Sequence, residues 1–233
     1  LAVLGVVSSQ FGWNWTAADD YFLRAIQLDP NNATAQQWLA EAYCYRRRFE
    51  ECARHMKEAL ALDPLSPILA TASALHARFS GQYEIARRNH VAVLKTYPTF
   101  SFAEYQLGLI ASAAGDWTTA ARHLEHVLPV FGPVLGGAPL GFVYARAGRV
   151  AEARAIEADL QRLSATQYVP PLAFSDIAMG FGDYALAKKW LQRAETVHDD
   201  FLVTIGVDHH HRELHGDPQF EALLRRLGLP PSP

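Results

Sequence analysis

The feature that most constrains this chain is a repeat of 34 residues. Pro30, Pro64 and Pro98 follow one another at this interval, each one or two positions after a leucine or a tyrosine. A column of large residues keeps the same spacing apart from one step of 33, with Val150 among the aromatics: Trp15, Phe49, Tyr83, Trp117, Val150 and Tyr184. A column of small residues follows three positions later: Ala18, Cys52, Ala86, Ala120, Ala153 and Ala187. A fixed period of this length is typical of stacked structural repeats, in which neighbours bury a shared core.

Each repeat is expected to hold two antiparallel helices. A second column of small residues lies in the first half of the repeats: Ala40, Ala74, Gly108, Gly141 and Ser175. Small residues on both helices let them approach closely. Glycines follow the first helix at the position suited to a left-handed cap: Gly81, Gly115, Gly148 and Gly182. The prolines cannot continue a helix and end the second one. The pattern therefore predicts an all-α chain without a sheet.

The period divides the chain into about six repeats, the first truncated at its start. The expected bounds are 1–32, 33–66, 67–100, 101–133, 134–167 and 168–200. Residues 201–233 leave the pattern and are expected to form a connection and a capping helix. Phe220, Leu223, Leu224 and Leu227 have helical spacing and place this helix over 217–228. It is expected to cover the apolar face that a final hairpin would otherwise expose.

The combined columns resemble the tetratricopeptide repeat, over nearly the whole chain. This resemblance implies helical hairpins stacked in a right-handed superhelix that binds a protein or peptide. A narrower resemblance is carried by the aromatic-rich 11–15 and by 216–220, where Gln219 replaces an arginine. It points to the repeat region of bacterial regulators that carry a winged-helix, kinase or adenylate cyclase domain. Because the chain starts at Leu1, we expect it to be a segment of such a longer protein.

The resemblance also implies a binding surface on the first helix of each repeat. In the family, the second, fifth, ninth, twelfth and thirteenth residues of a repeat face the concave side. Carried over by register, they are Gln37, Glu41, Tyr45, Thr71, Leu75, Arg78, Phe79, Phe102, Tyr105, Leu109, Phe142 and Arg146. This lining is more apolar than charged, which suits an amphipathic helix or an extended peptide with hydrophobic anchors. Two alternatives remain open: these side chains pack between hairpins, or the chain's own terminal segment fills the groove.

Composition and charge exclude several other classes of protein. The formal charge is −3 and charges of both signs are interleaved, so no nucleic-acid footprint is present. The longest apolar run at the start, residues 1–7, is too short for a membrane span, and we expect a cytoplasmic protein. Cys44 and Cys52 are expected to be reduced, buried thiols, because two cysteines make no disulfide framework. No cofactor is expected.

The histidines near the C-terminus are the one cluster that suggests chemistry: His209, His210, His211 and His215. His211 and His215 are four positions apart, so a helix would place both imidazoles on one face, where they could bind Zn²⁺. The alternative interpretation is a solvated connection before the terminal helix. The chain has no phosphate-binding loop, nucleophile elbow or Cys-x-x-Cys pair, so we expect no enzyme.

Three functional classes therefore remain. A protein- or peptide-binding scaffold in a signalling or transcription-regulatory protein is the main expectation. A self-association module, giving a homo-oligomer, is the second, and a histidine-based metal module the third.

Overall fold

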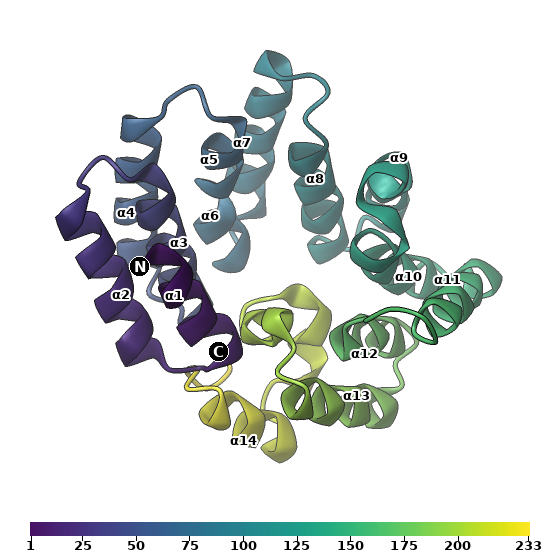
Figure 1. Ribbon diagram of the computed structural model, residues 1–233. Coiled ribbons are helices and arrows are strands. Elements are labelled where there is room, and N and C mark those ends of the chain that lie inside the picture. Colours follow the sequence, from purple (N-terminus) through teal and green to yellow (C-terminus); the bar gives the residue numbers. More distant parts are fainter. The chain divides into compact units, whose positions relative to one another are not determined.

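Every regular element of the computed structural model, which describes all 233 residues, is helical. The chain forms fourteen α-helices, one short π-helix and two short 3-10 helices, and no strand (Figure 1). The all-α expectation is therefore confirmed. The helices fall into two compact units. The first unit holds residues 1–98, 203–208 and 215–233, and the second holds 99–202 and 209–214.

The first unit contains three antiparallel helix pairs and the terminal helix. Helices α1 (Ala2–Val6) and η1 (Val7–Phe11) pack against α2 (Trp15–Leu28). Next, α3 (Ala33–Tyr45) packs against α4 (Phe49–Leu62). The pair α5 (Pro67–Ala72) and α6 (Leu75–Phe79) packs against α7 (Tyr83–Thr96). The terminal helix of this unit is α14 (Pro218–Arg226).

The second unit contains three further hairpins. They are α8 (Ser101–Ala113) with α9 (Trp117–Leu135), α10 (Gly137–Arg146) with α11 (Val150–Leu163), and α12 (Pro171–Gly180) with α13 (Tyr184–Thr196). The two 3-10 helices, η2 (Asp200–Thr204) and η3 (His209–Leu214), lie between α13 and α14 in the sequence. Within each unit the helices are tetratricopeptide-like hairpins.

The small-residue columns account for the close helix pairs. Ala18, Ala86, Ala120, Ala153 and Ala187 are all completely buried. In the partner column, a Cβ added to Gly108 would lie 2.8 Å from Leu124 Cγ, so no larger residue fits without displacement of its neighbour. The predicted cap glycines have φ angles of +73° to +79°, which an L-residue with a Cβ adopts at a cost. These positions therefore set both the spacing and the ends of the helices.

The first helix of the repeat at 67–100 is broken into α5 and α6. The Ser73 hydroxyl donates a hydrogen bond to the Ala70 carbonyl at 2.7 Å, and such back-bonding bends helices. A second irregularity lies in α9, where Gly132 has φ 69° and ψ 178° between Pro129 and Pro133. The Gly- and Pro-rich stretch in the middle of the sequence therefore forms a kink within one helix.

The terminal helix forms where its spacing predicted, and α14 belongs to the first unit. That it caps the last hairpin stays a prediction. In the first unit, the Trp15 indole Nε1 donates a buried hydrogen bond of 2.7 Å to the Leu227 carbonyl at the end of α14. A helix with a strong apolar face can cover any exposed partner face, and the sequence pattern does not specify which one.

The cysteines also differ from expectation. Cys44 and Cys52 are joined by a disulfide, with their Cα atoms 5.3 Å apart. Cys44 lies on α3 and Cys52 on α4, and the small residues that bring these helices together also bring the two sulfurs within bonding distance. No single helix is long and apolar enough to cross a membrane, although α9 and α10, bent by 117°, meet the length and composition criteria as a pair.

Candidate partner-binding surface

In the first unit, three predicted lining residues follow one another along α3. Gln37, Glu41 and Tyr45 are spaced four apart, so their side chains lie along one face of the helix. The Gln37 amide Nε2 donates a hydrogen bond to Glu41 Oε1 at 2.8 Å. Glu41 and Tyr45 line a pocket of about 200 Å³, which Trp38, Ala42, Val6, Ser9, Gln10 and Phe22 complete. Sequence reasoning found one wall of this pocket and missed the wall from the N-terminal helices.

The Glu41 side chain is half-buried and lines the pocket. Burial raises its pKa above the usual value, and the hydrogen bond from Gln37 offsets part of this effect. No side-chain nitrogen of a lysine, arginine or histidine lies within 4.0 Å of the carboxylate. Among the eight lining residues, Glu41 is the one with an acidic or basic side chain. The pocket therefore holds an acid without a cationic partner.

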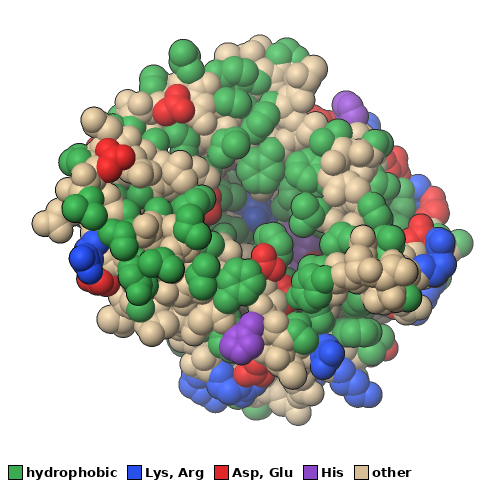
Figure 2. Space-filling view, viewed as in Figure 1, with side chains coloured by type: hydrophobic (Ala, Val, Ile, Leu, Met, Phe, Trp, Pro, Cys, Tyr) green, Lys and Arg blue, Asp and Glu red, His purple; other side chains and the backbone are tan.

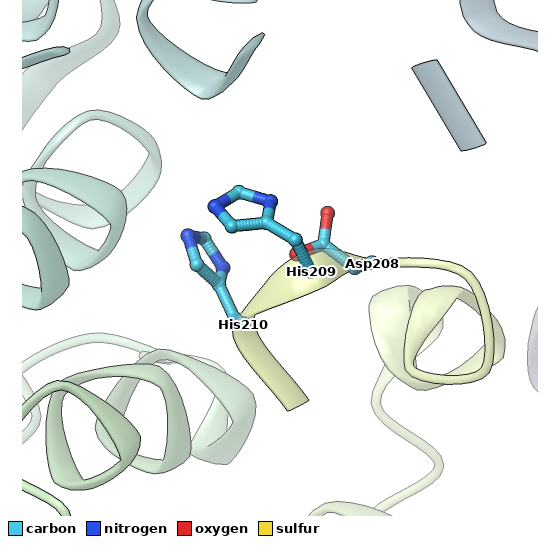
Figure 3. Close-up of side chains that lie close together, drawn as sticks. All are labelled: Asp208, His209 and His210. Atoms are coloured by element: carbon cyan, nitrogen blue, oxygen red, sulfur yellow. The ribbon is translucent and has the colours of Figure 1, made fainter. Parts of the chain in front are cut away.

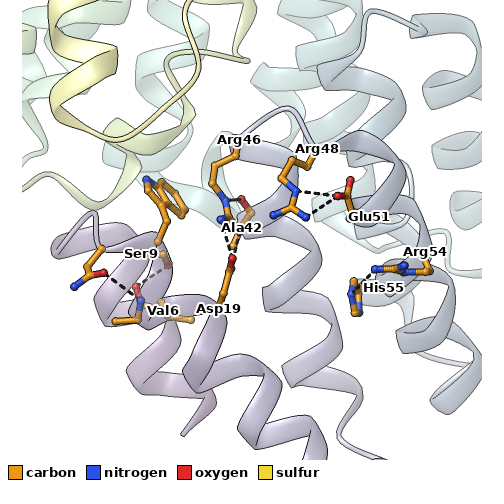
Figure 4. A network of polar contacts seen from close by, with 12 residues as sticks. Val6, Ser9, Asp19, Ala42, Arg46, Arg48, Glu51, Arg54 and His55 are labelled. Carbon is orange, nitrogen blue, oxygen red and sulfur yellow. Dashed lines mark hydrogen bonds and ion pairs between the residues drawn. The ribbon is translucent and has the colours of Figure 1, made fainter.

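Arg46, at the C-terminal end of α3, is the basic residue nearest to Glu41 along this helix, and it pairs with another carboxylate. The Arg46 guanidinium forms two hydrogen bonds to Asp19, at 2.6 and 2.9 Å, and its Nε donates to the Ala42 carbonyl (Figure 4). It also lies over the rings of Trp15 and Tyr43. In the turn between α3 and α4, Arg48 pairs with Glu51 at 2.6 Å, and Arg47 donates to the Pro231 carbonyl. All three arginines thus make contacts within the first unit.

The remaining predicted residues of the first unit are largely covered. Thr71, Leu75 and Arg78 are buried. The Arg78 guanidinium lies 3.1 Å from the Asp208 carboxylate, so the segment 203–208 of the chain itself contacts this part of the lining. Phe79 is half-buried, and its ring contacts both Tyr45 and the Arg78 guanidinium. Our expectation that Thr71, Leu75 and Arg78 form an open surface is therefore wrong.

The second unit shows the same pattern of covered residues. Leu109 and Phe142 are buried, and the Phe142 ring contacts the rings of His209 and His210 with centroids 5.8 and 4.3 Å away. The Arg146 guanidinium is paired with the Glu213 carboxylate. Residues 209–214 thus cover this lining as well. These contacts agree with the alternative that the terminal segment fills the groove at Phe142 and Arg146, and Leu109 is not open because it is buried.

Phe102 and Tyr105 on α8 are half-buried. Their rings stack with centroids 6.3 Å apart, and the Tyr105 ring lies 5.0 Å from that of Phe131 on α9. Phe100 joins the edge of this group, 6.4 Å from Phe102. We call these four residues the α8 aromatic cluster. Charged side chains, in contrast, are scattered over the face shown in Figure 2, without a continuous basic area.

The histidine segment is not a solvated connection. His209–Leu214 forms the 3-10 helix η3, in which His210 and His211 are buried. Because η3 is not an α-helix and ends before His215, the expected pairing of His211 and His215 on one helical face is wrong. His209 Nε2 lies 2.8 Å from the Ser112 hydroxyl, and His210 Nδ1 lies 3.6 Å from the Asp176 carboxylate. These imidazoles form polar contacts beneath the surface of the second unit.

The structure brings a different set of metal-type ligands together. One ligand atom each from the consecutive residues Asp208, His209 and His210 lies within 4.8 Å of the others (Figure 3). One carboxylate and two imidazoles would suit Zn²⁺. The Asp208 carboxylate, however, already pairs with Arg78, and His209 Nε2 with Ser112. The donors are thus engaged in contacts that tie the segment to its surroundings, which does not favour a metal site.

The buried Ser175, His211 and Asp176 superficially resemble a catalytic set. The Ser175 hydroxyl lies 3.0 Å from His211 Nε2, but the same nitrogen is the one nearest the Asp176 carboxylate, at 3.7 Å. In a nucleophilic triad the acid contacts the opposite ring nitrogen. Ser175 is also completely buried, and its hydroxyl lies 3.2 Å from the Ala187 carbonyl. The arrangement joins η3 to α12 and α13.

A charge pattern in the sequence could have revealed the covered surface. Asp208 and Glu213 lie five residues apart in the terminal segment, and each meets one of the two arginines predicted to line the groove. The presence of Asp208 and Glu213 could have suggested that the terminal segment pairs with Arg78 and Arg146. Asp176, in contrast, offers no such signal, because it follows a small-residue column and faces histidines far along the chain.

Comparison with known proteins adds little to this description. No family model and no curated protein matches the chain. Among solved structures, one similar chain comes from "Structure of Naa15/Naa10 bound to HypK-THB", with 16% sequence identity and a TM-score of 0.45. The match covers 98% of this chain and 39% of that one. The tetratricopeptide-like description of the fold therefore rests on the helix pairs, caps and small-residue columns within each unit.

Proposed function

We propose that this chain is a non-catalytic scaffold that binds a peptide segment of another protein. The observation that carries this proposal is the α8 aromatic cluster, whose four side chains stay only half-buried, whereas residues 209–214 contact the lining residues Phe142 and Arg146 of the same unit. Aromatic side chains are enriched among the residues that dominate the energy of protein interfaces. The occupant we propose is a short segment with apolar anchors, because no charged residue belongs to the cluster.

The wider context is also a proposal. The resemblance of 11–15 and 216–220 to bacterial regulators supports a role as the interaction region of a signalling or transcription-regulatory protein. In the first unit, the Asp217 side chain accepts hydrogen bonds from the Gln219 and Phe220 backbone and so begins α14. Part of the motif at 216–220 therefore serves to start α14. Gln219 takes part through its backbone N–H group. A cytoplasmic location remains an expectation of this context.

The test is selection of binding peptides from a displayed random library. The dissociation constant of a selected peptide is then measured for the parent and for the double variant Phe102→Ala/Tyr105→Ala. We expect at least a hundredfold weaker binding, since truncating an interface hot spot costs about 2 kcal/mol or more per residue. Tyr168→Ala is the matched control, because Tyr168 is 60% exposed in the same unit but lies outside the cluster.

The proposal fails if the double variant keeps its helical circular dichroism spectrum and binds every selected peptide as tightly as the parent does. Self-association is the second candidate, and α1 favours it. Leu1, Val3, Leu4 and Val7 are each 43% to 63% exposed, which gives this helix an apolar face. Light scattering of the isolated chain separates the two candidates: a concentration-dependent dimer mass that Val3→Ser/Val7→Ser abolishes would support self-association.

A further inference from the structure

The pocket on α3 combines one carboxylate with aromatic walls. Phe22, Trp38 and Tyr45 supply three aromatic side chains, and Glu41 supplies the carboxyl group. Aromatic faces attract cations through their ring quadrupole, and the attraction is strongest where water is excluded. With about 200 Å³ the pocket is smaller than the roughly 300 Å³ or more that drug-sized ligands occupy. It therefore fits a group the size of a side chain.

The charge balance of the pocket indicates the sign of its ligand. A carboxylate without a cationic partner is costly to bury, and a bound cation would restore its pairing. Glu41 has no such partner in the chain, because Arg46 is bound to Asp19. The polar groups opposite are the Gln10 amide and the Ser9 hydroxyl, which donates to the Val6 carbonyl. Neither carries a charge that could neutralise the acid.

The geometry of the carboxylate indicates which kind of cation fits. Glu41 Oε1 already accepts the hydrogen bond from Gln37, which leaves Oε2 for a ligand. An arginine guanidinium binds best when both carboxylate oxygens are available for its planar fork. An ammonium is a compact charge that one oxygen can accept. Its alkyl chain would lie against the aromatic walls.

We propose that this pocket binds an alkylammonium group, with the ammonium donating to Glu41 and the chain lying against Trp38, Phe22 and Tyr45. Two sources share this chemistry: the lysine side chain of a bound peptide, and a free small amine. In the lysine form the proposal rests on the peptide-binding function above. It concerns the first unit, whereas the α8 aromatic cluster lies in the second, so the two proposals can fail separately.

The experiment is titration of the full chain with n-butylamine at pH 7, followed by NMR of the tryptophan indole signals. Nα-acetyl-lysine methylamide is the second probe, and its Nε-acetylated form is the uncharged control. We expect the parent to bind at least one charged probe and not the acetylated one. Glu41→Gln should weaken binding by about tenfold or more, because one charge-assisted hydrogen bond is lost. This variant should fold, since a neutral amide replaces a poorly hydrated acid.

Glu50→Gln is the matched control, because it removes the same charge from an exposed position on α4 of the same unit. It should bind as the parent does. Binding of both charged probes assigns the pocket to a lysine side chain, and binding of butylamine alone assigns it to a small amine. The proposal is overturned if neither charged probe binds the folded parent, or if Glu41→Gln binds them as tightly. If the alkylammonium proposal is overturned but a selected peptide still binds more weakly to the Phe102→Ala/Tyr105→Ala variant, the proposed scaffold function stands.

Discussion

Two buried titratable side chains give the two units opposite responses to pH. His90 is completely buried in the first unit, where burial and then the Arg78 charge lower its pKa to about 4. The unfolded chain takes up this proton near pH 6.5, so stability falls as pH drops from about 6.5 to about 4. In the second unit, burial raises the pKa of Asp199 to about 6. Its contribution has the opposite slope and is lost as pH rises through about 6.

The His90 contribution can be isolated by substitution. Leu124 and Leu191 stand in the same column as His90, so His90→Leu should pack without strain. Relative to the parent, we expect its free energy of unfolding to gain about 2 kcal/mol more at pH 5 than at pH 7, because the buried imidazole no longer resists protonation. Urea denaturation at the two pH values measures the difference. His126→Leu, at a 78% exposed side chain, is the control for the loss of an imidazole. Equal gains for His90→Leu at pH 5 and pH 7 would contradict the assignment.

Among the elements, those whose partner is the next helix in the chain follow the sequence pattern. The Ala18 and Ala120 positions mark close contacts, and Gly115 and Gly148 end helices as expected. Contacts made over long distances were not predictable. The column pattern says nothing about the break between α5 and α6, where the Ser73 hydroxyl donates to the Ala70 carbonyl. Nor does it say that α14 belongs with α2, since an apolar stripe does not identify its partner.

The attachment of α14 to α2 can be tested at Gly228. A Cβ at this glycine would lie 2.7 Å from Trp15 Cδ1, and φ is +66°. Gly228→Ala should therefore push the indole away from the Leu227 carbonyl, and an unsatisfied buried group costs about 1–3 kcal/mol. We expect faster amide hydrogen exchange throughout α14.

Gly216→Ala is the control for this test, because φ is +79° there but no atom lies within 4 Å of the added Cβ. It carries the backbone strain without the clash. If both variants accelerate exchange in α14 equally, the Trp15 contact does not hold the helix.

For the whole molecule, the sequence was sufficient to predict an all-α chain of hairpins and a lining on the first helices. Half of that lining was misplaced for a physical reason. The register of the repeat predicts the helix face on which a side chain lies. It does not predict which other segments of the chain pack against that face. Asp208 reaches Arg78 across 130 residues and Glu213 reaches Arg146 across 67, and neither contact follows from a 34-residue period. The pocket at Glu41 was half predicted, since its second wall comes from the irregular N-terminal helices.

The bond between Trp15 and the Leu227 carbonyl has a consequence for synthesis on the ribosome. Its two partners are 212 residues apart, so α2 is synthesised long before the residue that completes its packing. The hairpins from α8 to α13, in contrast, join neighbours in sequence and can form as they emerge. Although synthesis proceeds from the N-terminus, we expect the hairpins of the second unit to complete their folding before the first unit does. Until α14 has been synthesised, the nascent first unit exposes the apolar surface that this helix later covers, and this is the stage at which chaperones would be needed.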